Sequence, residues 1–315
     1  MRVAVLDDYQ RVAQSLADWG SLGPDVEVTF FHDHLSDADD LVRRLADRDV
    51  VVLMRERTPF DAALLARLPR LRLLVTTGAR NGSIDLAAAA ARGVVVSGTP
   101  GSGTTTVELA WGLVLSLLRR VPQEDAALRR GEWQTTLGHG LTGRTLGILG
   151  LGRLGKRMAA VGLAFGMEVV AWSQNLTTEA AVEAGVVRVE REELFRRADV
   201  LSVHLVLSDR TRGLVGAAEL ALMKPTALLI NTSRGPVVES AALVDALHSG
   251  RIAGAGLDVY DSEPLPPADP LRSAPNTVLT PHLGFVTEDV YRIWYGGAVE
   301  DIAAFRAGSP LRVLS

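Results

Sequence analysis

Short aliphatic runs alternate with amphipathic stretches over the first hundred residues of the chain. The aliphatic runs predict strands at residues 3–6, 26–30, 50–54, 71–76 and 94–97. Between them, stretches such as residues 41–45 and 85–91 have the apolar spacing of surface helices. Because strands that are buried on both faces consist of continuous apolar residues, this alternation predicts a parallel sheet covered by helices.

A second series of the same kind begins at Thr145, after a break in the pattern. The break holds turn-forming residues at 99–103, a long helix predicted from about Thr104 past Leu118, and a polar stretch at 121–143 that we expect to be irregular. Beyond it, strands are predicted at residues 146–149, 168–172, 200–204, 227–230, 253–257 and 277–279, and helices at residues 153–165, 192–197, 240–247 and about 288–304. The sequence therefore predicts an α/β fold class with two doubly wound lobes, the second inserted into the first.

Composition narrows the classes of function. The net charge of −4 and the scattered arginines argue against a nucleic-acid surface, which needs clustered basic residues. The absence of cysteine excludes disulfides, cysteine metal sites and thiol catalysis. The first residues have no signal-peptide pattern, and the longest apolar run, 109–118, is about half the ~20 residues that a membrane span needs. We therefore expect a cytoplasmic protein with no membrane contact.

A glycine-rich turn lies between a predicted strand and a predicted helix, at Gly150-Leu151-Gly152-Arg153-Leu154-Gly155. In this context Gly150 permits the tight turn, Gly152 lets the backbone approach a pyrophosphate, and Gly155 allows the helix to lie close to the strand. The N–H groups and the dipole at the start of the helix then attract phosphates. The turn predicts a dinucleotide site.

The residue that selects between NAD and NADP is expected about twenty positions later, at the end of the next strand. Ser173 occupies this place, so the carboxylate typical of NAD sites is missing. A serine with neighbouring amides would suit the 2′-phosphate of NADP, but no arginine follows directly. A neutral loop without a role in cofactor choice is the alternative.

Three polar segments follow predicted strands, at residues 231–235, 258–264 and 280–284. Open α/β sheets bind ligands at the carboxyl ends of their strands. His282 is suited to protonating the alkoxide that forms when a hydride reaches a ketone, and Glu263 could orient and stabilise its imidazolium. The planar fork of Arg234 could hold the carboxylate and carbonyl of a 2-oxo acid.

These segments resemble the D-isomer-specific 2-hydroxyacid dehydrogenase family over essentially the whole chain. The resemblance rests on residues 147–155, 231–239, 254–264 and 281–284. It implies a Rossmann-type NAD(P)-binding domain, residues 100–285, inserted into a smaller flavodoxin-like substrate domain formed by residues 1–99 and 286–315. By the same resemblance, Arg234, Glu263 and His282 are the substrate arginine, the orienting acid and the acid/base histidine.

The resemblance also implies contacts with NAD or NADP outside the glycines. Arg153 and Leu154 match pyrophosphate contacts, Leu205 and Leu207 lie in the stretch that passes the adenine, Thr232 and Ser233 match backbone contacts, and Asp258 approaches the nicotinamide end.

In the smaller domain, the family binds the substrate carboxylate with a glycine-containing loop, which here begins Thr77-Gly78-Ala79. Gly78 and Ala79 are therefore substrate-binding candidates. The loop departs from the family's pattern, because Arg80 stands where a second glycine is usual and Gly82 where an aspartate is usual. Arg55, after the third predicted strand, could bind a second anionic group; an ordinary loop arginine is the alternative.

The family implies a small 2-oxo or 2-hydroxy acid as substrate and a homodimer, with the segment from about Thr104 to Leu137 in the contact. The apolar face of the helix in that segment, which includes Leu113, could equally be intramolecular core. A corepressor-like dinucleotide sensor and a phosphonate or formate dehydrogenase are the alternative functions. We predict no metal site, and we expect His32 and His34, which flank Asp33, to lie in a solvated loop.

Overall fold

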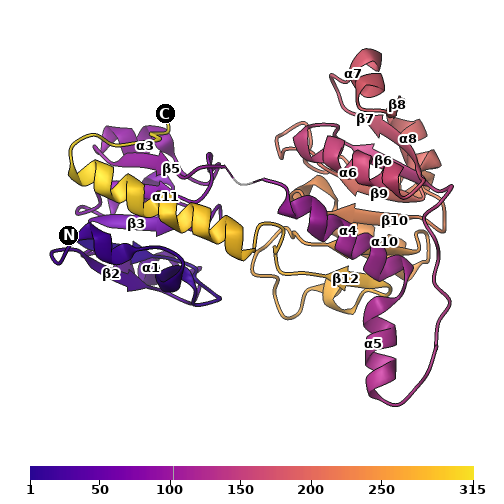
Figure 1. Cartoon of the computed structure of the whole chain (residues 1–315), viewed down its shortest axis with the longest axis horizontal. Helices are drawn as coiled ribbons and strands as arrows, with labels where there is room; N and C mark the ends of the chain where they lie inside the picture. Colours follow the sequence, from indigo (N-terminus) through magenta and orange to yellow (C-terminus); the bar gives the residue numbers. More distant parts are fainter. Residues whose placement is uncertain (102) are drawn as a thin grey trace. The chain divides into compact units, whose positions relative to one another are not determined.

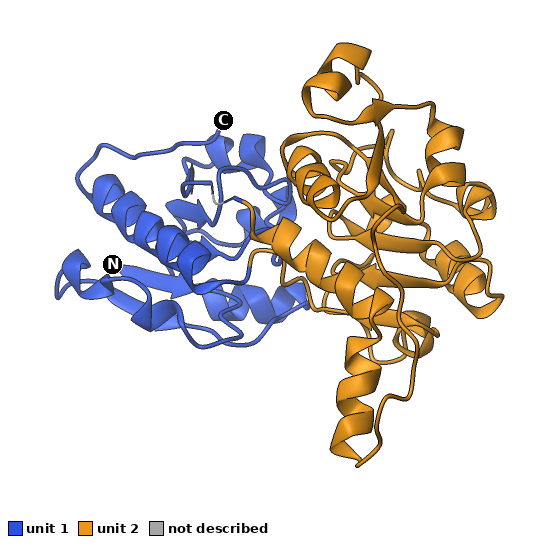
Figure 2. Cartoon of the chain, turned by 45° about the vertical axis from the view of Figure 1, so that its right-hand side comes forward, with its two compact units in different colours: residues 1–103, 286–315 blue, residues 104–285 orange. Residues whose placement is uncertain are grey.

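The chain folds into two compact units, Met1–Gly103 with Val286–Ser315 (unit 1) and Thr104–Phe285 (unit 2) (Figure 2). The computed structural model describes residues 1–101 and 103–315 (Figure 1). The first boundary lies after the predicted one because Pro100 belongs to unit 1, where its carbonyl accepts a hydrogen bond from the Trp294 indole at 3.1 Å. The dinucleotide and substrate roles of the two domains remain predictions.

Unit 1 contains a five-stranded parallel sheet in the order β2-β1-β3-β4-β5. Its strands are β1 (Arg2–Val5), β2 (Glu27–Phe30), β3 (Val50–Leu53), β4 (Leu73–Thr76) and β5 (Val95–Gly98), and its helices are α1 (Ala38–Leu45), α2 (Ala62–Ala66), α3 (Leu86–Ala91) and α11 (Glu288–Arg306). The order 2-1-3-4-5 is that of flavodoxin-like folds, as predicted. The α11 helix packs on β4, so residues 286–315 belong to the same unit as residues 1–103.

Unit 2 contains a seven-stranded parallel sheet in the order β12-β11-β10-β9-β6-β7-β8. Its strands are β6 (Thr145–Leu149), β7 (Glu168–Trp172), β8 (Val187–Arg188), β9 (Val200–Val203), β10 (Leu228–Asn231), β11 (Gly254–Leu257) and β12 (Thr277–Leu279). Its helices are α4 (Thr105–Leu118), α5 (Val121–Arg129), α6 (Arg153–Ala164), α7 (Thr178–Glu183), α8 (Arg191–Arg197), α9 (Ala217–Leu222) and α10 (Ser240–His248). The strand order reverses between β6 and β9, as in Rossmann folds, so the predicted fold class is confirmed.

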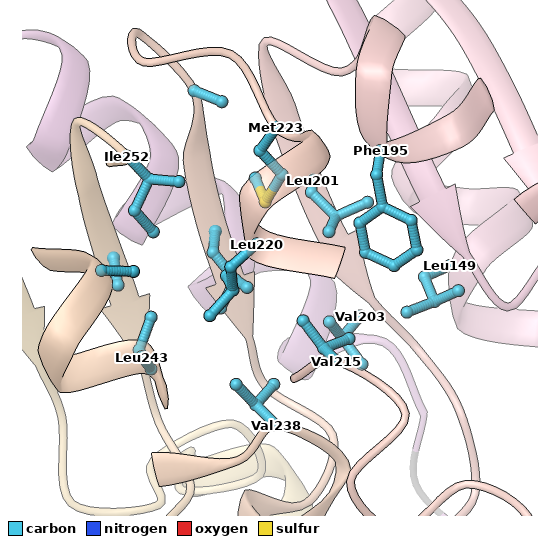
Figure 3. Packing of buried hydrophobic residues seen from close by; sticks show 14 of the residues in the cluster. Leu149, Phe195, Leu201, Val203, Val215, Leu220, Met223, Val238, Leu243 and Ile252 are labelled. Atoms are coloured by element: carbon cyan, nitrogen blue, oxygen red, sulfur yellow. The ribbon is translucent and has the colours of Figure 1, made fainter. Parts of the chain in front are cut away.

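Helices bury apolar residues on both faces of the unit 2 sheet. On one face, Phe195 and Leu220 lie with Leu201 and Val203 of β9 in the cluster drawn in Figure 3. On the other face, Leu113 of α4 belongs to a cluster with strand residues of β6, β7, β9 and β10. The apolar face of α4 is therefore intramolecular core.

The stretch expected to be irregular contains a helix, α5, so that part of the prediction was wrong. Its first turn holds Pro122 and Glu124, which suit a helix start, and Asp125 pairs with Arg129 one turn later at 2.9 Å. Only Ala127 of this helix is buried. Since no apolar periodicity marks the helix, the hydrophobic pattern could not predict it.

The prediction of a solvated loop was also wrong for His34. Its Nδ1 lies 2.9 Å from Oδ1 of the buried Asp7, and its side chain is 14% exposed. His32 lies beside Asp8, whose carboxylate is buried. The described residues contain no cluster of three potential metal ligands, and none of their helices has the length and apolarity that crossing a bilayer requires.

Candidate active site

The glycine-rich turn joins β6 to α6 with the backbone geometry that the motif requires. Gly150 has φ +106°, and a Cβ there would lie 2.7 Å from the His204 carbonyl oxygen. A Cβ at Gly155 would collide with the Gly150 carbonyl, so the third glycine allows the helix to lie against the turn. At Gly152 the space is open. The second glycine is thus the one that leaves its surroundings accessible to a ligand.

The residues around this turn fit a dinucleotide. The α6 helix has twelve residues and no side-chain cap at Gly152, so its first N–H groups can meet phosphates. Within the described chain, the Thr232 hydroxyl is buried and has no hydrogen-bond partner. Ser233 donates its hydroxyl hydrogen to the Leu205 carbonyl, which ties the loop after β10 to the loop after β9. A buried hydroxyl without a partner is costly, and a bound polar ligand would supply one.

Ser173, at the end of β7, holds the glycine turn. Its Oγ accepts a hydrogen bond from the Leu151 N–H at 2.7 Å. A hydroxyl that accepts one bond still has its own hydrogen to donate. This contact could not be predicted from the sequence, because no motif links a turn to a serine on the following strand.

Arg188, on β8, is a residue that the sequence reasoning missed. Its Nε donates to the Leu176 carbonyl, 2.9 Å away, in the loop that begins with Ser173. Its guanidinium also pairs with Glu190 at 3.0 Å. The register of β8 against β7, which places Arg188 opposite Ala171, brings this cation to the loop. Arg188 is remote in sequence from the glycine motif, so the spacing of residues after that motif could not identify it.

His282 and Glu263 form a close pair. Nδ1 of His282 lies 2.6 Å from Oε2 of Glu263, and Oε1 of the same carboxylate accepts the Tyr260 N–H at 3.0 Å. Burial acts to raise the pKa of Glu263, but the hydrogen bond and charge of His282, together with the Tyr260 N–H, outweigh it and lower this pKa. The carboxylate therefore stays ionised beside the imidazole at neutral pH.

Arg234 follows the end of β10, and its charge acts on the pair of His282 and Glu263. Asn231 donates to the Arg234 carbonyl at 3.0 Å, and the guanidinium donates to the Ser233 carbonyl at 2.7 Å, which together fix the turn. A Cβ at Gly235 would collide with the Tyr260 backbone, so the two loops are in close contact. The positive charge of Arg234 contributes to the lowered pKa of Glu263. The structure thus brings the three predicted residues of unit 2 together.

Asp258 supports the loop that carries His282. Its buried carboxylate accepts hydrogen bonds from the Thr280 hydroxyl at 2.6 Å, the Leu283 N–H at 2.7 Å and the Gly284 N–H at 2.8 Å. Burial raises the pKa of Asp258, and these hydrogen bonds oppose the shift. Its implied contact with the nicotinamide end remains a prediction.

His204 differs from His282 in its surroundings. Its Nε2 lies 2.8 Å from the Ser202 hydroxyl, and burial lowers the pKa of His204 to about 4. The imidazole is therefore neutral at pH 7 and has a structural place at the end of β9.

In unit 1, Gly78 follows β4 with φ +87°, a conformation that favours glycine. Its N–H donates to the Thr99 hydroxyl at 2.7 Å. The space where a Cβ would project is filled by the Arg55 guanidinium. The substrate roles predicted for Gly78 and Ala79 are not tested by this geometry.

Arg55 packs along the loop that contains Gly78. Its guanidinium donates to the carbonyls of Thr77 at 3.3 Å and Arg80 at 3.4 Å, lies 3.3 Å from Glu56, and stacks over the Trp294 ring. These contacts favour the reading of Arg55 as a residue that holds the loop. Its role toward a second anionic group remains a prediction.

Comparisons with known proteins agree with this arrangement. Residues 111–284 match the family model of the D-isomer specific 2-hydroxyacid dehydrogenase, NAD binding domain. Glyoxylate reductase of Aeropyrum pernix is 41% identical over 282 residues, which cover 86% of this chain and 81% of that protein. Glyoxylate reductase of Thermococcus litoralis is 39% identical over 258 residues, which cover 79% of this chain and 78% of that protein.

A solved structure of phosphoglycerate oxidoreductase from Vibrio cholerae superposes with a TM-score of 0.93 at 40% identity, covering 98% of this chain and 100% of that one. The residues that match the family model include the glycine turn and the pair of His282 and Glu263. The chain belongs to the D-isomer specific 2-hydroxyacid dehydrogenase family.

Proposed function

We propose that this protein is a reversible NAD(P)-dependent reductase that converts a small 2-oxo acid to the D-2-hydroxy acid. The observation that carries the proposal is the 2.6 Å contact between His282 and Glu263, beside Arg234 and in the unit that holds the glycine turn. A bound dinucleotide supplies or accepts the hydride. The side chains of the protein bind the acid and move the proton.

In reduction, the oxygen of the ketone gains negative charge and must be protonated. Nδ1 of His282 faces Glu263, so Nε2 is the nitrogen that donates the proton to this oxygen. The ionised Glu263 stabilises the imidazolium before transfer and fixes the ring. Arg234 binds the carboxylate of the acid with its planar fork. In the oxidation direction, His282 accepts the proton instead.

We propose a small monoanionic substrate such as glyoxylate or hydroxypyruvate. The contacts of Arg55 with the loop backbone and Glu56 support a substrate with a single negative charge, since they occupy the guanidinium that would bind a second anionic group. The relatives from Aeropyrum pernix and Thermococcus litoralis are glyoxylate reductases. Turnover of NADH and NADPH with a panel of 2-oxo acids tests the proposal. Binding of the dinucleotide without turnover of any 2-oxo acid would contradict it.

We propose that the cofactor site accepts NADPH at least as well as NADH. The end of β7 has the neutral Ser173, Gln174 and Asn175 where NAD sites place an acid, and Arg188 donates to a carbonyl of the same loop. A 2′-phosphate therefore meets no carboxylate from these three residues.

Ser173→Asp is expected to lower kcat/KM for NADPH by about tenfold, because a carboxylate would face the 2′-phosphate, while NADH is retained or improved. The aspartate can still accept the Leu151 N–H that Ser173 now accepts, so the turn should keep its shape. Steady-state kinetics with both cofactors measure the ratio, and Ser173→Ala separates the loss of the hydroxyl from the gain of charge. An unchanged ratio in the aspartate variant would refute the assignment of this loop to cofactor choice.

We propose that the protein is a homodimer whose contact includes the arm from α5 to Leu137. Apolar side chains project from this arm into solvent, with Leu128 57%, Trp133 76% and Leu137 89% exposed. Three large apolar side chains this exposed on one segment are typical of an interface.

Light scattering is expected to give the mass of two chains for the natural protein. Leu137→Asp is expected to shift it toward one chain, because the charge would be buried without a partner. Val182→Asp, at an exposed position of α7, is the matched control and should leave the mass unchanged. A monomeric natural protein at micromolar concentration would contradict the dimer.

A further inference from the structure

Two threonine hydroxyls from the first turn of α4 converge on one carbonyl of the loop that carries His282. Thr105 Oγ1 donates to the Gly284 carbonyl at 2.8 Å, and Thr106 Oγ1 donates to the same oxygen at 3.0 Å. In the sequence, Thr105 and Thr106 lie 179 and 178 positions before Gly284. No sequence motif or family match assigns these hydroxyls a role.

The other side of the same residue is held equally firmly. The Gly284 N–H donates to Asp258 Oδ2 at 2.8 Å, and the Leu283 N–H donates to Oδ1 at 2.7 Å. A Cβ at Gly284 would lie 3.1 Å from Thr106 Cγ2 and 3.2 Å from Asp258 Oδ2, so an added methyl group would press on two members of this arrangement. The backbone of Gly284 is thus fixed through both its N–H and its carbonyl. We call Thr105, Thr106 and Asp258 the loop clamp.

His282 needs such support, because its backbone lies in the left-handed region. Its φ is +54°, which is unfavourable for a residue with a side chain and persists only where the surroundings enforce it. The His282 N–H donates to the Thr280 carbonyl at 3.0 Å, which closes a tight turn on one side. On the other side, the clamp on Gly284, two residues later, prevents the loop from relaxing.

We infer that Thr105 and Thr106 are positioning residues that hold the His282 loop through the Gly284 carbonyl, so that the imidazole keeps its contact with Glu263. This inference rests on the proposed function, in which His282 transfers the proton. The chain passes between its two units directly before Thr104 and directly after Phe285. The loop clamp joins these two segments inside unit 2. A change of the backbone at either point where the chain passes between the units therefore does not displace His282.

The two hydroxyls serve one acceptor, which makes their effects non-additive. A carbonyl oxygen has two lone pairs and is satisfied by one donor, so either threonine alone can hold it. Removal of both leaves a half-buried carbonyl unpaired and frees the loop. Double-mutant cycles detect such a relation, because the effect of the pair exceeds the sum of the single effects.

The experiment compares Thr105→Val, Thr106→Val and the double variant in the full-length enzyme. Each single variant is expected to keep kcat for glyoxylate reduction within about threefold, and the double variant to lose about tenfold, with the KM for the dinucleotide nearly unchanged. The loss should bring a shift of the acid limb of the pH profile to higher pH, since the freed imidazole no longer helps to lower the pKa of Glu263. The double variant with serine at both positions keeps both hydroxyls and is expected to restore kcat and the profile.

Thr277→Val is the matched control, because it removes a hydroxyl bond to the Ala274 carbonyl, 3.0 Å long, elsewhere in unit 2. A double valine variant with the natural kcat and pH profile would overturn the inference, and so would a loss that serine does not restore. If the double valine variant does not fold, Gly284→Ala replaces it and must show the same lowered kcat and shifted profile. An active His282→Ala enzyme would instead defeat the proposed function itself, which keeps the two failures distinct.

Discussion

Replacing His282 with alanine is expected to lower kcat for 2-oxo acid reduction by about 10²–10⁴-fold, the range of general acid catalysis. The imidazole is paired through Nδ1 with an ionised carboxylate, and its Nε2 is the proton donor in the proposed mechanism. His204, the other histidine that follows a strand of unit 2, is buried with a pKa of about 4 and is neutral, so it is not suited to act as the acid in its place. The dissociation constant of the dinucleotide should change little, because the glycine turn is a separate segment of unit 2.

Single-turnover kinetics and cofactor titration measure these two quantities separately. His139→Ala is the matched control, because His139 lies in the arm after α5 and its N–H contacts only the backbone at Leu118 among the bonds described. A His282→Ala enzyme that keeps more than about a tenth of the natural kcat with every 2-oxo acid would disprove the role of the histidine.

Glu263→Gln tests the second half of the same pair through the pH dependence. The lowered pKa of Glu263 means that its carboxylate is ionised at neutral pH and loses its charge only in acid. Glutamine keeps the shape but not the charge, so the imidazolium loses its stabilising partner. Reduction by the natural enzyme should decline in acid as Glu263 is protonated, whereas the glutamine variant should be slower at neutral pH and lack this decline. A pH profile identical to the natural one would contradict the pairing.

Most of the strands could be predicted from the sequence because they are buried, as β3, β4, β6, β9, β10 and β11 are over their whole length. Predicted and observed strand ends agree to within two residues for the eleven strands that aliphatic runs mark. The β8 strand was missed because its two residues, Val187 and Arg188, are exposed at the edge of the sheet and form no apolar run. The α5 helix was missed for the same physical reason, since it has almost no buried face and therefore no apolar periodicity.

The residues of the site could likewise be predicted from the sequence only in part. Arg234, Glu263 and His282 each follow a strand, so the rule that ligands bind at the carboxyl ends of parallel strands predicts that they lie close together. The contacts that shape their surroundings obey no such rule. Ser173 meets Leu151 at the ends of two neighbouring strands, and Thr105 and Thr106 meet Gly284 from the far end of the unit's sequence. These are hydrogen bonds between remote segments, which only the folded chain reveals.

Arg234→Lys is expected to lower kcat/KM for the 2-oxo acid by about a hundredfold, although the charge is kept. The planar guanidinium can bind a carboxylate with two parallel hydrogen bonds, whereas an ammonium group acts as a point charge. In the structure, one amino group of Arg234 also donates to the Ser233 carbonyl at 2.7 Å, which orients the fork. Lysine would lose both the fork and this support.

Steady-state kinetics give the loss, and Arg251→Lys, an exposed arginine before β11, is the matched control. Arg234→Ala adds a chemical test, because free guanidinium ions should restore part of its activity by filling the vacated place, while ammonium ions should not. The same additive should leave the His282→Ala enzyme inactive, since that variant lacks the proton donor and retains its arginine. An Arg234→Lys enzyme within about twofold of the natural kcat/KM would show that the carboxylate is bound elsewhere.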